Sequence, residues 1–339
     1  MIPARNEADV IGRTVSSLLR QEFPGELRLF VVDDGSADGT ANAARSAAGA
    51  LGVMEKLVVI SGSAVPAPWK GKVWAMQQGW QAARMMQPDF VLLTDADIEH
   101  ASDNLARLLT QAGSRSFDLV SVMVKLHCQT LAEKFAIPAF VYFFFLLYPP
   151  ARVANPGSRV AGAAGGCVLI RSQILARAGG FESIRGEIID DCSLAARVKN
   201  VEGRLWLGVS QKTRSIRGYT TLSSLREMIS RTAFNQLRHS WLLLVACIAG
   251  MMLTFVAPLA LVWAKDRTAG WIAAATCIAM FGSYLPILRL YRVNPLSAVT
   301  LPFAAIFYVY ATICSAINYC QGRGGQWKGR AQDAPLSSS

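Results

Sequence analysis

Short apolar runs alternate with segments of helical periodicity along the first two thirds of the chain. The runs are rich in Val, Ile, Leu and Phe, as strands buried on both faces are. They lie at residues 27–32, 57–60, 90–93, 118–124 and 168–170. Apolar residues recur at helical spacing at residues 9–19, 73–85 and 103–112, and again after residue 190. This alternation predicts an open, mostly parallel sheet with helices on both faces.

The chain opens with Met1-Ile2-Pro3-Ala4-Arg5-Asn6-Glu7, which we interpret as a loop. A parallel α/β sheet should begin with a strand, and little room for one remains before this loop. We therefore expect either that the sequence begins inside a longer protein or that the first strand is lost.

The last third of the chain has a different pattern, with apolar stretches at residues 241–263, 271–288 and 299–320. Each stretch has about 18 to 23 residues, which is the length that crosses a bilayer. Trp241, Trp263, Trp271 and Tyr319 lie near their ends, as in an aromatic belt. We predict about three membrane helices.

Two further segments have the character of a membrane surface. Residues 135–148 are nearly all apolar but short, which indicates an interfacial or re-entrant helix, with a buried core helix as the alternative. Residues 222–237 form an amphipathic pattern that carries several arginines. We expect an α/β domain at residues 1–220, an interfacial helix at 221–240, the membrane helices at 241–320 and a basic, polar tail at 321–339.

The distribution of basic residues favours the cytoplasm for the α/β domain and for the loop before residue 299. The residues are Arg226, Arg231, Arg238, Arg289 and Arg292. Three spans would then place the tail outside, whereas its Arg323, Lys328 and Arg330 favour the inside. This conflict indicates either a re-entrant segment or a different number of spans.

Composition agrees with a membrane protein, since 52% of residues are hydrophobic and the formal net charge is +11. Such charge suits anionic lipid headgroups and anionic substrates. No nucleic-acid-binding motif is present, so nucleic acid is not an expected partner. The seven cysteines form no CxxC pair and are expected to be reduced. The absence of GxGxxG argues against a dinucleotide-binding oxidoreductase.

Carboxylates follow two of the predicted strands. Asp95 and Asp97 come after residues 90–93, and a strand places residues i and i+2 on one side. Two carboxylates suit Mg²⁺ or Mn²⁺, which proteins usually share with substrate phosphates. The alternative is that Asp95 caps a helix and Asp97 is a solvated loop residue. Asp33 and Asp34 likewise follow a strand, either at a ligand-binding edge or in a plain polar turn.

Three other positions are candidates for chemistry. Gly71 between two lysines, including Lys72, suits close approach of a phosphate, although a surface loop has the same composition. Gly165-Gly166 would allow a ligand to approach the backbone before a strand. Asp190-Asp191 open a helix, where a carboxylate is ordinarily a cap that stabilises by roughly 1 kcal/mol.

Together these motifs resemble the catalytic domain of glycosyltransferase family 2, which has the GT-A fold, a Rossmann-like, mostly parallel sheet. The motifs are Pro3-Ala4-Arg5-Asn6-Glu7, Val32-Asp33-Asp34-Gly35-Ser36, Gly71-Lys72, Asp95-Ala96-Asp97, Gly165-Gly166 and Asp190-Asp191. They follow in the family's order, and the resemblance covers roughly residues 1–240. The tail with residues 324–330 resembles the branch associated with hopanoid biosynthesis.

The resemblance implies a role for each matching residue. Residues that hold the nucleotide-sugar would be Pro3, Ala4, Asn6, Glu7, Asp33, Asp34, Lys72 near the diphosphate, and Asp95. Asp95 and Asp97 would hold Mn²⁺ or Mg²⁺. Gly165, Gly166 and Asp190 would line the acceptor site. Asp191 would be the catalytic base, with Asp190 in place of the family's glutamate.

The implied reaction suits these residue types. A divalent cation offsets the charge that develops on a leaving diphosphate, and a carboxylate can deprotonate an acceptor hydroxyl. One base and direct attack imply inversion. The expected protein is a multi-pass enzyme of the cytoplasmic membrane, with its catalytic domain in the cytoplasm. It would move a sugar from a UDP-sugar to a lipid acceptor in hopanoid biosynthesis.

One family motif is altered, and other functions stay open. The QxxRW motif is not intact, because Gln236, Arg238 and Trp241 have the residue types without the spacing. This weakens the case for a processive polysaccharide synthase. The alternatives are a polyprenyl-phosphate sugar transferase and a catalytically silent, nucleotide-binding membrane partner.

Overall fold

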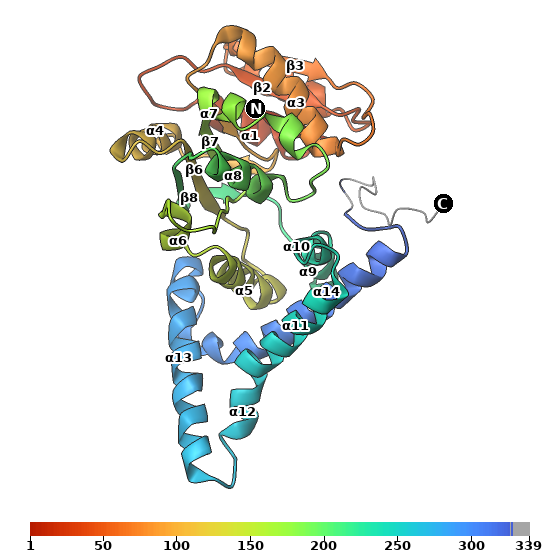
Figure 1. Cartoon of the computed structure of the whole chain (residues 1–339). Coiled ribbons are helices and arrows are strands. Elements are labelled where there is room, and N and C mark those ends of the chain that lie inside the picture. Colours follow the sequence, from red (N-terminus) through yellow and green to blue (C-terminus); the bar gives the residue numbers. More distant parts are fainter. Residues whose placement is uncertain (326, 328–339) are drawn as a thin grey trace. The chain divides into compact units, whose positions relative to one another are not determined.

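The computed structural model describes residues 1–325 and 327, which form two compact units (Figure 1). The first unit contains Met1–Leu126 and Tyr148–Arg217. The second contains His127–Leu147 and the described chain from Gly218 onward. The chain therefore leaves the first unit twice, after residue 126 and after residue 217. Most of the polar tail, including Lys328 and Arg330, lies outside the described residues.

The first unit is built on two sheets. One has the order β1-β2-β3, from β1 (Ile2–Ala4), β2 (Leu29–Asp33) and β3 (Leu57–Ser61). The other has the order β4-β7-β6-β8-β5, from β4 (Phe90–Leu93), β5 (Ile98–Glu99), β6 (Leu119–Lys125), β7 (Val168–Arg171) and β8 (Leu205–Ser215). Met1 joins the sheets, because its amino group donates to Leu92 O (2.7 Å) and its carbonyl accepts from Thr94 N (3.2 Å).

Strand direction agrees with the predicted mostly parallel sheet. The pairs β1–β2, β2–β3 and β6–β8 are parallel. Strand β7 runs antiparallel to both β4 and β6, and β5 runs antiparallel to β8. Since β4 and β6 both oppose β7, they share one direction. Their C-terminal ends therefore lie at the same edge of the sheet, where the sequence places its carboxylates.

The prediction of a loop from the first residue is wrong for Ile2–Ala4. These residues form β1, which pairs with β2 in the register Ile2↔Val31. Ile2 and Ala4 are fully buried and pack against Ile11 and Val15 of the first helix. A three-residue strand that contains a proline is too short to show a periodic signal, which explains the error.

Helices cover the sheets, and those near residues 9–19, 73–85, 103–112 and after residue 190 lie at the predicted places. They are α1 (Ile11–Leu19), α2 (Thr40–Ala50), α3 (Gly71–Ala83), α4 (Asn104–Ser114), α6 (Pro150–Ala154), α7 (Ser172–Arg177) and α8 (Asp190–Asn200), with 3-10 turns at Met54–Lys56, Arg84–Met86 and Phe181–Ile184. Leu105 and Leu108 of α4 pack against Val120 of β6 in one core cluster. Strand β8 was not predicted, because its second half contains polar residues such as Lys212 and Arg214.

The second unit is helical. Its elements are α5 (Leu131–Leu147), α9 (Leu222–Ser230), α10 (Ala233–Gln236), α11 (Trp241–Met251), α12 (Ala257–Leu261), α13 (Arg267–Tyr291) and α14 (Leu301–Cys320). A π-helical turn at Met252–Val256 joins α11 to α12 just before Pro258, and a 3-10 turn at Pro295–Thr300 precedes α14. The amphipathic helix predicted at 222–237 breaks after Ser230.

Four helical segments among the described residues are long and apolar enough to cross a membrane, one more than predicted. They are Leu131–Ala154, Trp241–Leu261, Arg267–Tyr291 and Pro295–Cys320. The additional one contains the short apolar stretch that was expected to be interfacial or re-entrant. Length and composition alone do not decide which of the four cross.

We expect Ile170→Ala to lower the midpoint of thermal unfolding of the first unit. Ile170 is fully buried on the inner strand β7 between β4 and β6, and such a truncation costs about 2–5 kcal/mol. Val209→Ala on β8 is the control, since Val209 is 40% exposed and its truncation should change stability by about 0.5 kcal/mol or less. Melting of detergent-solubilised protein measures both, and equal midpoints would contradict this packing.

Candidate active site

Lys72 connects two acidic motifs that are far apart in the sequence. Asp95 follows β4, and Lys72 lies in the first turn of α3, with its Nζ 2.9 Å from Asp95 Oδ1. The same Nζ is 3.3 Å from Asp190 Oδ2 at the start of α8. Burial alone would lower the pKa of Lys72, but Asp190, Asp95 and Asp191 together raise it above its usual value. Lys72 is therefore a permanent cation between these motifs.

Asp97 is held by a cation that the sequence analysis did not identify. Arg217, directly after β8, places Nε 3.0 Å from Asp97 Oδ2, and Ser215 Oγ donates to the same oxygen (3.2 Å). The other end of the Arg217 guanidinium pairs with Glu7 of the N-terminal loop. Burial and Asp95 raise the pKa of Asp97, and Arg217 partly offsets this shift. Arg217 thus ties the N-terminal motif to the Asp95-Ala96-Asp97 motif.

Asp191 is held by the backbone. Gly165 N donates to its Oδ2 (2.6 Å), and Cys192 N donates to its Oδ1 (2.7 Å). Burial and the neighbouring Asp190 raise the pKa of Asp191 to about 6, against the opposing effect of Lys72. A carboxyl group with this pKa is ionised at neutral pH and still accepts a proton readily, as a general base must.

The turn Gly165-Gly166 must consist of glycines, because Asp191 and Val124 leave no room for side chains there. A Cβ at Gly165 would lie 3.0 Å from Asp191 Oδ2, and one at Gly166 would lie 3.1 Å from Val124 Cγ2. The turn was predicted to line an acceptor site. In the structure Gly165 also orients the carboxylate of Asp191.

A small cavity joins these residues. It has a volume of about 10 Å³ and is lined by Pro3, Lys72, Asp95, Gly165 and Asp191, among others. This is about the space that one water molecule needs. A larger ligand could therefore lie against these residues only on their open side, or after a side chain such as Lys72 has moved.

The N-terminal loop and the end of β2 lie side by side. Asn6 has φ +51°, and its Oδ1 accepts from Ala37 N (3.0 Å). Asp33 Oδ1 accepts from Ser36 N (3.0 Å), which closes the turn after β2. Asp34 is buried, and its Oδ2 is 3.4 Å from Arg5 Nη1. The predicted residues Pro3 and Ala4 belong to β1, beside this turn.

A chain of buried hydrogen bonds supports the site from behind, and the sequence analysis missed it. Thr213 Oγ1 donates to Asn104 Oδ1 (2.9 Å), and Asn104 Nδ2 lies 3.0 Å from His100 Nδ1. His100 Nε2 is 2.9 Å from Thr94 Oγ1, which donates to Gly166 O (2.8 Å). Burial lowers the pKa of His100 to about 3. The imidazole is therefore neutral, accepts at Nδ1 and donates from Nε2.

The donor set fits a divalent cation in part. Among the described residues, no group of three or more His, Cys, Asp or Glu side chains is arranged to hold a metal ion. Asp95 and Asp97 each use one oxygen for a cationic partner, which leaves Asp95 Oδ2 and Asp97 Oδ1 for a metal. Mg²⁺ is commonly bound by one or two carboxylates plus substrate phosphates and water. The residues present suit that arrangement.

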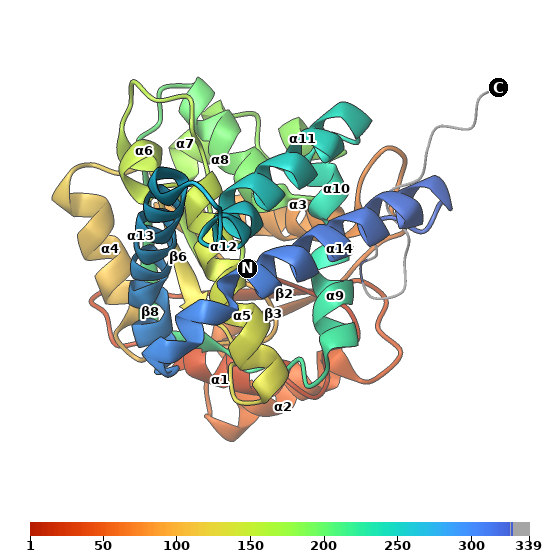
Figure 2. The same ribbon diagram turned by 90° about the horizontal axis from the view of Figure 1, so that it is seen from below.

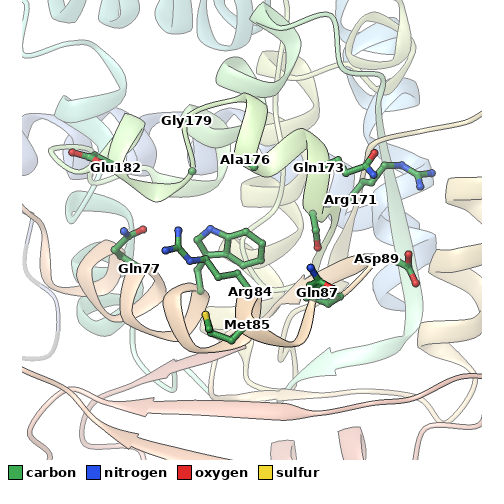
Figure 3. Close-up of a pocket in the computed structure, with 14 residues that line it drawn as sticks. Gln77, Arg84, Met85, Gln87, Asp89, Arg171, Gln173, Ala176, Gly179 and Glu182 are labelled. Atoms are coloured by element: carbon green, nitrogen blue, oxygen red, sulfur yellow. The ribbon is translucent and has the colours of Figure 1, made fainter.

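A larger pocket of about 770 Å³ lies elsewhere in the first unit and contains none of the predicted site residues. Figure 3 shows Gln77, Arg84 and Gln87, from α3 and the segment after it, opposite Gln173 and Gly179, from α7 and its C-terminal end. The pocket adjoins Asp89 and Arg171, at the ends of β4 and β7 opposite to Asp95 and Gly166.

Comparison with known proteins identifies one family. The model described as Glycosyltransferase like family 2 matches residues 1–233. A search of curated proteins found no match.

Comparison with solved structures found distant likenesses. S. aureus TarS matches with a TM-score of 0.43 and 17% identity over 96% of this chain and 55% of that one. The chain thus spans little more than half the length of that protein. M. tuberculosis glucosyl-3-phosphoglycerate synthase, in complex with Mn²⁺, uridine diphosphate and glucosyl-3-phosphoglycerate, matches with a TM-score of 0.39 and 19% identity, covering 68% of this chain and 76% of that one. At TM-scores below 0.5, these likenesses do not establish a shared substrate.

We expect Arg217→Gln to weaken Mn²⁺ binding by about 10- to 100-fold, because a residue that orients a metal-binding carboxylate typically contributes that much. Titration of Mn²⁺ followed by electron paramagnetic resonance measures this affinity without any reaction. Arg214→Gln is the matched control, since Arg214 pairs with Glu99 on the exposed side of β8. Unchanged affinity in Arg217→Gln would show that Arg217 does not orient Asp97.

Proposed function

Because the chain belongs to the Glycosyltransferase like family 2, whose model covers residues 1–233, we propose that it transfers a sugar from a UDP-sugar to a lipid acceptor at a membrane. The first unit has the GT-A-like fold of that family, with the mostly parallel sheet described above. The observation that carries the proposal is the position of Lys72 between Asp95 and Asp190. Lys72 thereby connects Asp95, which is proposed to bind the donor, with the Asp190-Asp191 motif, which is proposed to contain the catalytic base.

The donor end of the site would bind a nucleotide diphosphate. The N-terminal loop, Asp33 and Asp34 would contact the nucleoside, and Lys72 would exchange a carboxylate for a phosphate oxygen. Asp95 and Asp97 would hold Mn²⁺ or Mg²⁺, which, when bound, offsets the charge of the leaving diphosphate. An excess of carboxylates over cationic side chains in the cluster supports a divalent cation there.

At the acceptor end, Asp191 would take the proton from the attacking hydroxyl. Gly165 N–H and Cys192 N–H orient its two oxygens, so the carboxylate is fixed before an acceptor binds. Direct attack by a hydroxyl on the face opposite the leaving diphosphate would invert the anomeric centre. A single positioned base, rather than a pair of nucleophile and acid, supports this stereochemistry.

The lipid acceptor is proposed from the apolar helices of the second unit, which would hold the enzyme at the bilayer where such an acceptor partitions. The arginines at residues 226, 231, 238, 289 and 292 support a cytoplasmic position for the catalytic unit, in the cytoplasmic membrane. A hopanoid precursor is the acceptor that the tail resemblance suggests. Gln326 and residues 328–330 of that tail lie outside the described residues.

We expect transfer by the wild type to fall tenfold per pH unit below about pH 6, because Asp191 has its pKa near that value and acts only when ionised. Above about pH 7 this group is almost fully ionised and gives no further gain. Asp191→Asn should abolish transfer while binding of uridine diphosphate stays within about twofold. The pH profile of kcat/KM, which reports the free enzyme, and calorimetric titration measure the two effects, and full activity of Asp191→Asn would refute the assigned base.

We expect membranes that contain the wild type and Mn²⁺ to transfer radiolabelled sugar from one UDP-sugar into the lipid extract, and Asp97→Ala to lose both transfer and donor binding. Asp103→Ala is a control, since Asp103 pairs with Arg107 and Lys212 on the exposed surface. Label on a polyprenyl phosphate would identify the alternative acceptor. Donor binding without transfer to any lipid would favour the silent partner.

A further inference from the structure

We propose that only two of the four apolar segments cross the bilayer, namely α11–α12 and α13. Helices α5 and α14 instead lie along the leaflet on the side where the chain passes from the first unit into α11. The proposal concerns membrane topology and holds whatever reaction the first unit catalyses. Its partner is a lipid surface.

Helix α5 begins and ends on one side of the membrane. Strands β6 and β7 flank it in the chain and pair directly in one sheet, with Leu119 opposite Ile170. The chain leaves the first unit after Leu126 and is part of it again from Tyr148. A helix that crossed the bilayer between these points would separate two hydrogen-bonded strands, so α5 does not cross.

The length that is free to enter the membrane is also at the lower limit for a crossing. Lys199 Nζ holds the segment after α5 in the first unit, because it donates to Val153 O (2.9 Å) and Val160 O (2.6 Å). Only α5 itself, with 17 residues, remains. At 1.5 Å per residue it is about 25 Å long, whereas the hydrocarbon core is about 30 Å thick.

A buried carboxylate joins the two places where the chain enters the second unit. Glu133, in the first turn of α5, has a fully buried side chain, and its Oε1 accepts from Tyr219 N (2.7 Å). The same oxygen is 2.7 Å from His127 Nδ1, and Oε2 accepts from Thr130 N (3.0 Å). Residues 127 and 219 follow the two exits from the first unit, so both exits and the start of α5 lie at one membrane face.

The end of α14 is at that face as well. Phe234 N donates to Ser315 Oγ (3.0 Å), and the Tyr319 ring stacks on His239 with 4.2 Å between centroids. Phe234 and His239 immediately precede α11, which starts at Trp241. The chain therefore returns to its starting face between Trp241 and Tyr319, which requires an even number of crossings. Three apolar helices lie between these points, so at least one of them does not cross.

The helix that does not cross is α14. Figure 1 shows α12 and α13 as the two arms of a hairpin, joined by a short connection, while Figure 2 shows α14 running beside α11 and over α9. The start of α14 follows the 3-10 turn that packs on α13, and Tyr308 OH in its middle donates to Ala136 O of α5 (3.1 Å). Its middle thus contacts α5 and its end contacts the segment before α11, and both of these elements lie at that face.

Charge agrees with this arrangement. With two crossings, the ends of α13 and α14 lie on the same side as the segment before α11. Six arginines, at residues 226, 231, 238, 289, 292 and 323, then share one side, against Lys265 and Arg267 on the other, which agrees with the positive-inside rule. Three crossings would place Arg323 opposite the others. This arrangement resolves the conflict between three spans and a basic tail on the inside. Arg323 alone is enough for this conclusion, so it does not depend on Lys328 and Arg330.

The exposed side chains of α14 suit a leaflet. Its exposed apolar residues recur at intervals of three and four and form one stripe: Phe303, Ile306, Tyr310, Ile313 and Ile317. The other side is buried and contains small residues such as Ala304, Ala311 and Ser315, which allow close helix packing. In the segments Leu131–Ala154 and Pro295–Cys320, which contain α5 and α14, 39% of the most apolar stretch is buried, against 17% in α11–α12 and 28% in α13. The two proposed crossing helices thus expose more of their surface to lipid.

The first experiment places epitope tags on the full chain with its cysteines intact. One tag follows Ser339, and the other lies between Lys265 and Asp266, in the connection before α13. Antibodies are applied to intact and permeabilised cells, and an antibody to the first unit reports its side. The proposal expects the C-terminal tag to share the side of the first unit and the connection tag to be opposite. A C-terminal tag on the side of the connection tag would overturn it.

The second experiment measures depth in reconstituted vesicles of brominated phosphatidylcholine, with a fluorophore on a single cysteine introduced into a variant whose seven native cysteines are replaced by alanine. Phe303→Cys, Ile313→Cys and Ile317→Cys should report equal depths if α14 lies along the leaflet. A crossing helix would place residue 313 deeper than the other two, which would overturn the proposal. Ile272→Cys and Ile278→Cys on α13 are matched controls, and six residues of a crossing helix should separate them by about 9 Å.

Discussion

Mutual repulsion among closely spaced carboxylates is the constraint on which the catalytic unit depends. Glu7, Asp95, Asp97, Asp190 and Asp191 converge on one edge of the sheet, and Lys72 and Arg217 are the cationic side chains paired with them. Desolvation and like charge disfavour the ionised forms, as the raised pKa values of Asp97 and Asp191 record. Each cation is therefore placed between two carboxylates of different motifs. The same shortage of positive charge supports the proposed divalent cation, which would in turn attract a diphosphate.

The buried hydrogen-bond network behind the site is uncharged. It fixes the turn after β4, at Thr94, and the turn before β7, at Gly166, without adding charge. His100 is buried with Thr94 and Asn104, so an imidazolium there would have no counter-ion. Because its pKa is lowered to about 3, the ring stays neutral, and the hydrogen-bond chain from Thr213 to Gly166 has one direction at all ordinary pH values. A buried polar network of this kind stabilises only when every member is paired. Here it links β4, α4, β7 and β8 behind the carboxylates.

The sequence predicted the parts of the site that carry local signals and missed those that depend on distant pairing. Asp95 and Asp97 follow an unmistakable buried strand, and Asp191 begins a helix, so their elements could be placed from pattern alone. Arg217 had no such signal, because its strand β8 is half polar and its partners Glu7 and Asp97 lie 210 and 120 residues away. The role of His100 was similarly missed, because it depends on hydrogen bonds to Thr94 and Asn104 that exist only in the folded structure. Strand β1 was missed because three residues cannot show a period.

The same distinction between local sequence pattern and distant contacts applies to the membrane helices. Hydropathy measures whether a segment is apolar, and helices α5 and α14 are apolar partly because they pack on other helices, as Ala136 and Tyr308 do. Whether a segment crosses depends on where its two ends are held, and that is decided by contacts such as Ser315 with Phe234 and by the pairing of β6 with β7. The number of apolar segments therefore sets only an upper limit on the number of membrane crossings. Strand pairing in the water-exposed unit lowers that limit, since hydrogen-bonded strands cannot lie on opposite sides of a bilayer.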